Sequence, residues 1–128
     1  MRPGVCVLAI AVAGLAATAN AHDLTLSECV EGSEFIMHAA MARDNGMSRN
    51  DFIGRMQGDI LAIQSMPKEL RWFVQDLDDE ALLVGHAERV YDAPGTPQAH
   101  QSEFMRVCLA QRERQTRAAR SRFDGEGE

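Results

Sequence analysis

The sequence predicts an all-α fold, a small bundle of four to five helices held by one disulfide bond. Apolar residues recur at helical spacing throughout the chain, and capping residues, Gly and Pro separate the periodic segments. No segment alternates apolar and polar residues between hairpin turns, which argues against a sheet. With 128 residues, 45% of them hydrophobic and 25% charged, the chain has the size and composition of one small globular domain.

Residues 1–21 have the features of an export signal. Arg2 precedes an apolar stretch, and small residues occupy the positions that favour cleavage after Ala21 or after Ala19. The apolar stretch is too short to cross a bilayer as a permanent helix. We therefore expect a periplasmic or secreted protein with no transmembrane anchor.

The first two helices are predicted to begin at Thr25 and Ser48. Both residue types are preferred N-caps, and an acidic residue follows each of them three positions later, at Glu28 and Asp51. Gly46 is a natural end for the first helix. The predicted inner faces are Leu26, Cys29, Val30, Met37, Ala40 and Met41 in the first helix and Phe52, Met56, Ile60 and Ile63 in the second.

Pro67 is predicted to open a third, short helix, because proline is favoured at the first position of a helix. This helix would carry Leu70, Phe73, Val74 and Leu77, with Trp72 nearby. A fourth helix is expected at residues 80–92, with Asp76 or Asp78 as its cap. Its inner face would be Leu83, Ala87, Val90 and Tyr91, with the Tyr91 ring packed and its hydroxyl in water.

The last helix is expected to be capped by Thr96 and opened by Pro97. It would present Phe104, Val107, Cys108 and Leu109 to the core. The chain therefore divides into a signal peptide (residues 1–21), a helical domain (residues 22–111), and an Arg-rich helix end with a disordered C-terminal tail (residues 112–128).

Two cysteines remain when the export signal, which contains Cys6, is removed. They are Cys29 and Cys108, near the two ends of the mature chain. An oxidising compartment favours a disulfide bond between them. Two buried thiols, or half of a metal site, are the alternatives, although the chain has no Cys-x-x-Cys pair of the kind that zinc sites use.

Charge is distributed unevenly along the chain, which has a formal net charge of −6. The body is acidic, and a basic segment near the C-terminus contains Arg112, Arg117 and Arg120. These arginines predict contact with anionic lipid head groups, lipopolysaccharide or an acidic partner. The alternative is that they suit the negative end of a helix dipole and keep the chain soluble. The acidic body argues against a nucleic-acid partner.

Two histidines are candidate metal ligands. Cleavage after Ala21 would make His22 the N-terminal residue, and its amine and imidazole could together chelate Cu(II). His100 and Glu103 have the spacing of two ligands on one helix face, but no His-Glu-x-x-His motif accompanies them. Such a copper site would be an accident of processing in most proteins, and we predict no cofactor.

Arg43 and Asp44 lie near the predicted end of the first helix. They could form a recognition pair on an exposed corner. Alternatively, Asp44 forms the local turn and Arg43 is a cation that suits the end of the helix.

Four landmarks of the chain together resemble a known arrangement. They are Cys29, the run Met-Ala-Arg-Asp-Asn-Gly-Met-Ser at residues 41–48, the run Val-Tyr-Asp-Ala-Pro at residues 90–94, and Phe104-x-x-x-Cys108. The arrangement is similar to that of short exported bacterial proteins of uncharacterised function, which combine an Arg-Asp-x-Gly element with a terminal Phe-x-x-x-Cys. This resemblance implies export, a Cys29–Cys108 pair and an all-helical domain, and it implies no activity. In size, helix content and single disulfide, the chain is also similar to small acid-stress chaperones of the bacterial periplasm.

The sequence predicts no enzyme, because it contains no nucleophile elbow, Gly-rich phosphate loop or haem-attachment motif. We expect a non-catalytic binding protein of the cell envelope, with an unknown protein or envelope component as its partner. A periplasmic copper-binding protein is one alternative. An envelope-stress chaperone with adaptable Met-rich faces is another, since the chain has 7 methionines.

Overall fold

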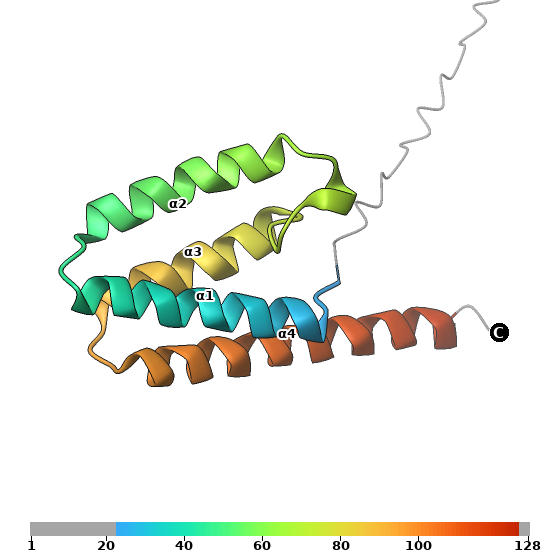
Figure 1. The fold of residues 1–128 in the computed structure, drawn as a ribbon. Coiled ribbons are helices and arrows are strands. Elements are labelled where there is room, and N and C mark those ends of the chain that lie inside the picture. Colours follow the sequence, from blue (N-terminus) through green and yellow to red (C-terminus); the bar gives the residue numbers. More distant parts are fainter. Residues whose placement is uncertain (1–22, 126–128) are drawn as a thin grey trace, which may run out of the picture.

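The computed structural model describes residues 23–125, and these form four α-helices and one short 3-10 helix. The helices are α1 (Leu26–Asp44), α2 (Arg49–Gln64), η1 (Lys68–Leu70), α3 (Leu77–Asp92) and α4 (Pro97–Gly125). Figure 1 shows α1 and α4 side by side with opposite directions, and α2 as the outermost helix on the other side. No strand occurs between residues 23 and 125. The predicted all-α bundle is therefore confirmed, while the predicted signal peptide and His22 lie outside the described residues.

The helices begin where the sequence predicts caps. The side chains of Thr25 and Ser48 each accept a hydrogen bond of 3.1 Å from the backbone N–H three residues later. Asp76, one of the two candidates for the next cap, accepts from the N–H of Asp79 at 2.9 Å, so α3 begins at Leu77. Thr96 accepts from the N–H of Ala99 at 3.1 Å and caps α4. Each cap satisfies a backbone donor that the helix itself leaves unpaired.

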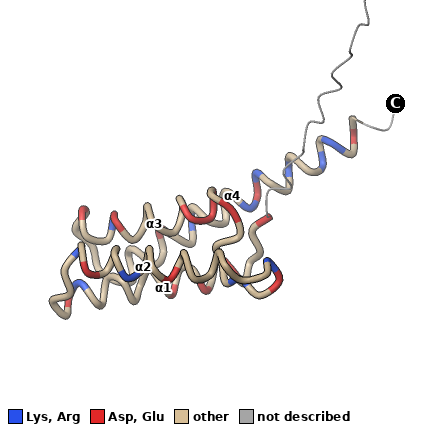
Figure 2. The backbone as a smooth tube through the Cα atoms, turned by 90° about the horizontal axis from the view of Figure 1, so that it is seen from above, with Lys and Arg blue, Asp and Glu red and all other residues tan. Residues whose placement is uncertain are grey.

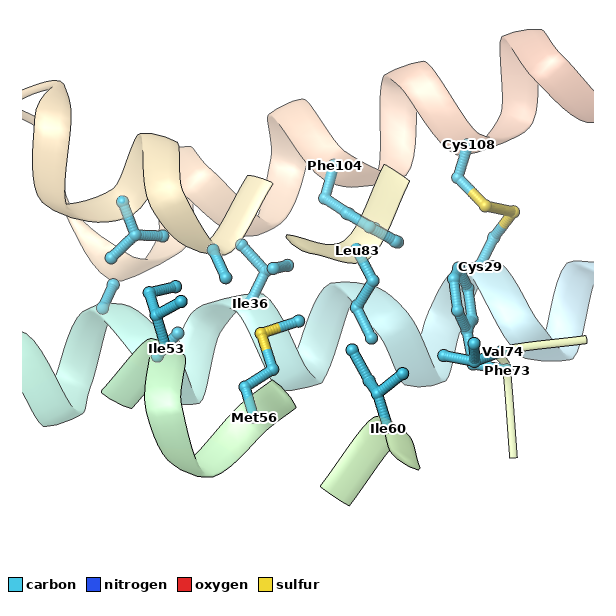
Figure 3. Packing of buried hydrophobic residues seen from close by; sticks show 14 of the residues in the cluster. Cys29, Ile36, Ile53, Met56, Ile60, Phe73, Val74, Leu83, Phe104 and Cys108 are labelled. Carbon is cyan, nitrogen blue, oxygen red and sulfur yellow. A yellow bond between two sulfur atoms is a disulfide. The ribbon is translucent and has the colours of Figure 1, made fainter. Parts of the chain in front are cut away.

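One disulfide bond joins α1 to α4. Cys29 and Cys108 are 79 residues apart in the sequence, and their sulfur atoms are bonded at 2.10 Å. Both side chains are completely buried, and Figure 3 shows the bond crossing between the two helices. The predicted pairing is confirmed. It fixes the start of the described chain against the middle of α4.

The core contains side chains from every α-helix and from the segment 71–76. Gly32 lies where α1 meets two aromatic rings, because a Cβ built there would come within 2.6 Å of Phe104 and 2.9 Å of Phe73. Those two rings pack with their centroids 5.8 Å apart. The buried hydrophobic residues are Leu24, Cys29, Ile36, Ala39, Ala40, Ile53, Met56, Ile60, Phe73, Val74, Leu83, Ala87, Val90, Phe104 and Cys108.

The predicted inner face of α1 is partly wrong. Leu26, Val30 and Met41 are 54%, 39% and 45% exposed. The buried face is instead Cys29, Gly32, Ser33, Ile36, Ala39 and Ala40. Most residues of this face are small, which lets neighbouring elements approach α1 closely. The prediction relied on the spacing of large apolar residues and therefore missed these small ones.

The predicted third helix is also wrong. Only Lys68–Leu70 form a helical turn, of the 3-10 type, and residues 71–76 are irregular. Phe73 adopts a positive φ of 51°, a conformation that no helical residue uses. Asp76 then starts α3, so Leu77 belongs to the next helix and is exposed.

Helix α4 continues without interruption past residue 111, where the core domain was predicted to end, and it runs to Gly125. Of its predicted inner residues, Phe104 and Cys108 are buried, whereas Leu109 is 36% exposed. The side chain of Gln115 accepts a hydrogen bond of 2.9 Å from the backbone N–H of Leu24. The predicted disordered tail lies largely beyond Gly125, outside the described residues.

Candidate functional site

An apolar hollow lies between α1, α2, α3 and the segment 71–76. Its volume is about 540 Å³, within the range of small-molecule binding sites. Figure 3 shows Met56 and Ile60 of α2 on one side and Leu83 of α3 above them. We call it the hollow, and its lining residues are Phe35, Met56, Asp59, Ile60, Ala62, Ile63, Trp72, Val74 and Leu83. Asp59 is the one charged residue in this lining.

Helix α2 forms one wall of the hollow and is held to α3 by polar contacts near its two ends. At its start, the guanidinium of Arg49 donates two hydrogen bonds to Asp92, of 3.0 and 3.1 Å. At its end, the side-chain amide of Gln64 donates to Glu80 at 3.0 Å. Between these points α2 presents apolar residues inward at helical spacing. The arrangement lets the middle of α2 face an incompletely filled space while its ends stay in place.

The segment 71–76 forms a second wall of the hollow. It is not helical, and hydrogen bonds from its side chains to backbone carbonyl groups hold it in place. The Arg71 guanidinium donates to the carbonyl oxygens of Met66 at 2.9 Å and Gln64 at 2.8 Å. The Gln75 side chain donates to the carbonyl oxygens of Lys68 and Arg71, at 3.0 and 3.1 Å. These bonds satisfy carbonyl groups at the end of α2 and hold the segment in a single shape.

Trp72 projects from this segment toward α1. Its indole N–H donates to the carboxylate of Glu31 at 2.9 Å, and its ring packs on Phe35 with centroids 5.7 Å apart. Phe35 in turn packs on Phe52 at 5.9 Å. These contacts fix the tryptophan at the edge of the hollow. The carboxylates of Glu31 and Asp59 give this edge a negative charge.

Arg43 and Asp44 tie the end of α1 to the end of α3. The guanidinium of Arg43 donates to the carbonyl oxygens of Val90 at 2.6 Å and Gly95 at 2.7 Å, and it also pairs with Asp44 at 2.9 Å. Its hydrogen-bonding capacity is therefore largely used within the fold. Arg43 therefore bridges α1 to the region where α3 ends, a contact that neither sequence-based interpretation of the pair includes.

His100 is buried at the same corner. Its Nε2 lies 3.5 Å from Nη1 of Arg43. Burial, followed by the positive charge of Arg43, lowers the pKa of His100 below its ordinary value. A nearby guanidinium also disfavours a metal cation at this imidazole.

Glu103, the second ligand of the predicted pair with His100, is engaged by arginines. Its carboxylate pairs with Arg106 at 2.7 Å and with Arg89 at 3.7 Å. The hydrogen bond from Arg106 is the largest influence on the pKa of Glu103, which is lowered. Within residues 23–125, no three His, Cys, Asp or Glu side chains cluster in a way that could hold a metal ion. His22, the other candidate ligand, lies outside these residues.

Arg112, Arg117 and Arg120 lie on the C-terminal part of α4, and all three are exposed. Arg117 pairs with Glu113 at 2.6 Å, one helical turn away. The structure therefore places the three predicted arginines along one helix and away from the hollow's lining.

The sequence predicted the apolar face of α2 but not the hollow. Met56, Ile60 and Ile63 have the spacing of any buried helical face, which does not show whether the opposing surface fills the space. Trp72 lines the hollow because the segment 71–76 is irregular, whereas the sequence predicted a helix there. A single tryptophan beside a stretch with several breaks is the one signal that could have indicated the site.

No helix within residues 23–125 combines the length and apolar character needed to cross a membrane. Comparisons of the chain with protein-family models, with curated proteins and with solved structures gave no match.

Proposed function

We propose that this protein is a non-catalytic binding protein of the cell envelope that holds an apolar molecule in the hollow. The observation that carries the proposal is a space of about 540 Å³ whose lining is apolar except for Asp59. Each Å² of apolar surface removed from water contributes roughly 25 cal/mol, so an apolar occupant stabilises the complex without any covalent step. The export signal predicted at residues 1–21 supports the location.

The charge at the edge of the hollow selects among apolar molecules. Asp59 lines the space, and the carboxylate of Glu31 accepts a hydrogen bond from Trp72, which also lines it. Carboxylates at the edge of the hollow repel an anionic head group and attract a cationic one. The ligand class that fits is therefore an uncharged or cationic molecule with an apolar body.

The sole tryptophan of the chain reports on this site directly, since Trp72 lines the hollow. The disulfide-bonded mature protein is titrated with the uncharged dye N-phenylnaphthylamine while Trp72 emission and dye emission are recorded. We expect both signals to saturate together, because dye in the hollow contacts the indole ring.

Two neighbouring positions on α2 provide a matched pair of variants. Ala62 lines the hollow, whereas Leu61 is 69% exposed and does not line it. Ala62→Phe fills part of the space and should weaken dye binding at least about tenfold, the effect of losing about 1.4 kcal/mol. Leu61→Phe should bind like the parent protein. Equal binding by the two variants, or no saturable binding by the parent, would remove the hollow as the site.

A further inference from the structure

The C-terminal end of α4 extends beyond the rest of the bundle. Among the described residues, the hydrogen bond between Leu24 and Gln115 is the last one that ties α4 to another element. Residues 116–125 continue the helix for about 15 Å, and Figure 1 shows them leaving the bundle at the end where η1 lies. Apart from Ala119, all of these residues are exposed. Within residues 23–125, no hydrogen bond or ion pair joins this projecting end, residues 116–125, to another helix.

Arginines surround the projecting end and its base on all sides. Successive residues of a helix are about 100° apart, so the positions 112, 114, 117, 120 and 122 are distributed around the whole circumference. Figure 2 shows Lys and Arg, in blue, along the end of α4 that leaves the bundle. Arg117 is paired with Glu113, whereas Arg112, Arg114 and Arg120 form no ion pair with another described residue. Most of this positive charge is therefore available to a partner.

A large apolar side chain lies near the tip of the same helix. Phe123 is 79% exposed, and Arg120 and Arg122 are close to it in the sequence. Exposing a phenyl ring to water is unfavourable, and burying it in an apolar environment is worth several times the thermal energy. The tip thus combines cations with an apolar anchor.

This combination fits a layer of anionic lipid better than a protein groove. A groove on an acidic protein contacts one side of a helix and leaves the arginines on the other sides unmatched. Lipid head groups surround an inserted helix end on every side, and their phosphates match the guanidinium group in geometry and charge. Apolar chains lie directly below the head groups, within reach of Phe123. A second copy fits less well, because two projecting ends carry the same charge.

We propose that residues 116–125 dock this protein on an anionic phospholipid surface, with Phe123 as the apolar anchor and Arg120 and Arg122 as phosphate contacts. In this orientation only the end of α4 contacts the lipid, and the acidic body is held away from the lipid surface. This site is separate from the hollow. The two proposals therefore succeed or fail independently.

The test is co-flotation of the full mature protein with vesicles of phosphatidylcholine, with or without phosphatidylglycerol. We expect binding only to the vesicles that contain phosphatidylglycerol. Arg120→Gln combined with Arg122→Gln should lower this binding about tenfold or more, since each basic side chain near an anionic surface contributes about a factor of five. Phe123→Ala should also weaken binding. The binding that remains in this variant should be lost at a lower salt concentration than the binding of the parent protein.

A charge-matched control removes two cations from the body instead. Arg55 and Lys68 are exposed on other elements, and Arg55→Gln combined with Lys68→Gln should bind like the parent. Equal loss in this control, or equal binding of the parent to both kinds of vesicle, would overturn the proposal. Binding to soluble polyglutamate as strong as to vesicles, and insensitive to Phe123→Ala, would assign the projecting end to an acidic protein instead. Unchanged thermal unfolding of every variant would confirm that the fold is intact.

Discussion

At Gly32, a single added methyl group would collide with the core. A Cβ there would lie 2.6 and 2.7 Å from Phe104 and 2.9 Å from Phe73, and both rings are buried. We expect Gly32→Ala to lower the free energy of unfolding by about 1–3 kcal/mol, because well-packed rings cannot move aside without strain. Gly85 is the control, since a Cβ there meets nothing within 4 Å. Urea denaturation should show that Gly85→Ala raises stability by up to about 1 kcal/mol.

Tyr91 has a buried hydroxyl group that makes no hydrogen bond within the described part of the chain. The sequence predicted a hydroxyl in water, and this prediction is wrong because the hydroxyl oxygen is buried. The Tyr91 ring packs on Phe52, with ring centroids 6.0 Å apart. Burial also raises the pKa of Tyr91. Tyr91→Phe should therefore keep or increase the free energy of unfolding, by up to about 1 kcal/mol, in urea denaturation. A decrease in the free energy of unfolding would mean that the hydroxyl has a partner.

Two histidines make the stability depend on pH. Burial lowers the pKa of both His86 and His100 below the ordinary value of a histidine, so the unfolded chain binds their protons more readily than the folded protein does. Stability should therefore be highest above about pH 6.5 and should fall as the pH decreases from there toward the folded pKa values. Urea denaturation across this range should show the decrease, and His100→Gln should make it smaller. A stability that rises on acidification would contradict this assignment.

Single residues were predictable from the sequence where their interactions are local. The caps at Thr25 and Ser48 were identified because the bonded N–H is three residues away. The contacts of Arg43 with Val90 and Gly95 join residues that are 47 and 52 positions apart, and no local pattern encodes them. Gly32 was not singled out, for the same reason.

At the scale of elements, α1 and α4 form the fixed part of the molecule and α2 the more loosely held part. The disulfide bond joins α1 to α4, while α2 is held to α3 near its ends by Arg49 and Gln64. The predicted helices agree with the structure where caps and spacing coincide. The prediction of a third helix was wrong. The spacing of Leu70, Phe73 and Val74 fits a helix, but the hydrogen bonds of Arg71 favour an irregular segment.

The disulfide bond should account for a large part of the stability. It closes a loop of 79 residues, and the chain-entropy model assigns about 4.5 kcal/mol to such a loop. Cys29→Ser combined with Cys108→Ser should lower the Tm by about 20–30 °C in calorimetry. The parent protein should show the same Tm as this variant once a reductant has opened the bond. Equal melting of the oxidised and reduced parent would mean that the bond does not stabilise the fold.

At the scale of the whole molecule, the fold offers two separate surfaces. The hollow is lined by residues of α1, α2, α3 and the segment 71–76. The projecting end of α4, which leaves the bundle in Figure 1, carries arginines and the exposed Phe123. The sequence predicted the arginines and the all-α fold. It did not predict the hollow, since an unfilled space depends on how four segments distant in sequence meet.

Hydrogen–deuterium exchange of the oxidised protein, with and without N-phenylnaphthylamine, tests the central claim that the hollow binds an apolar molecule. An occupant packed against α2 should suppress the local opening of that helix. We predict slower exchange in α2 and in residues 71–76 when the dye is bound, with no change in residues 116–125. Unchanged exchange in α2, or slowing confined to other helices, would contradict the claim.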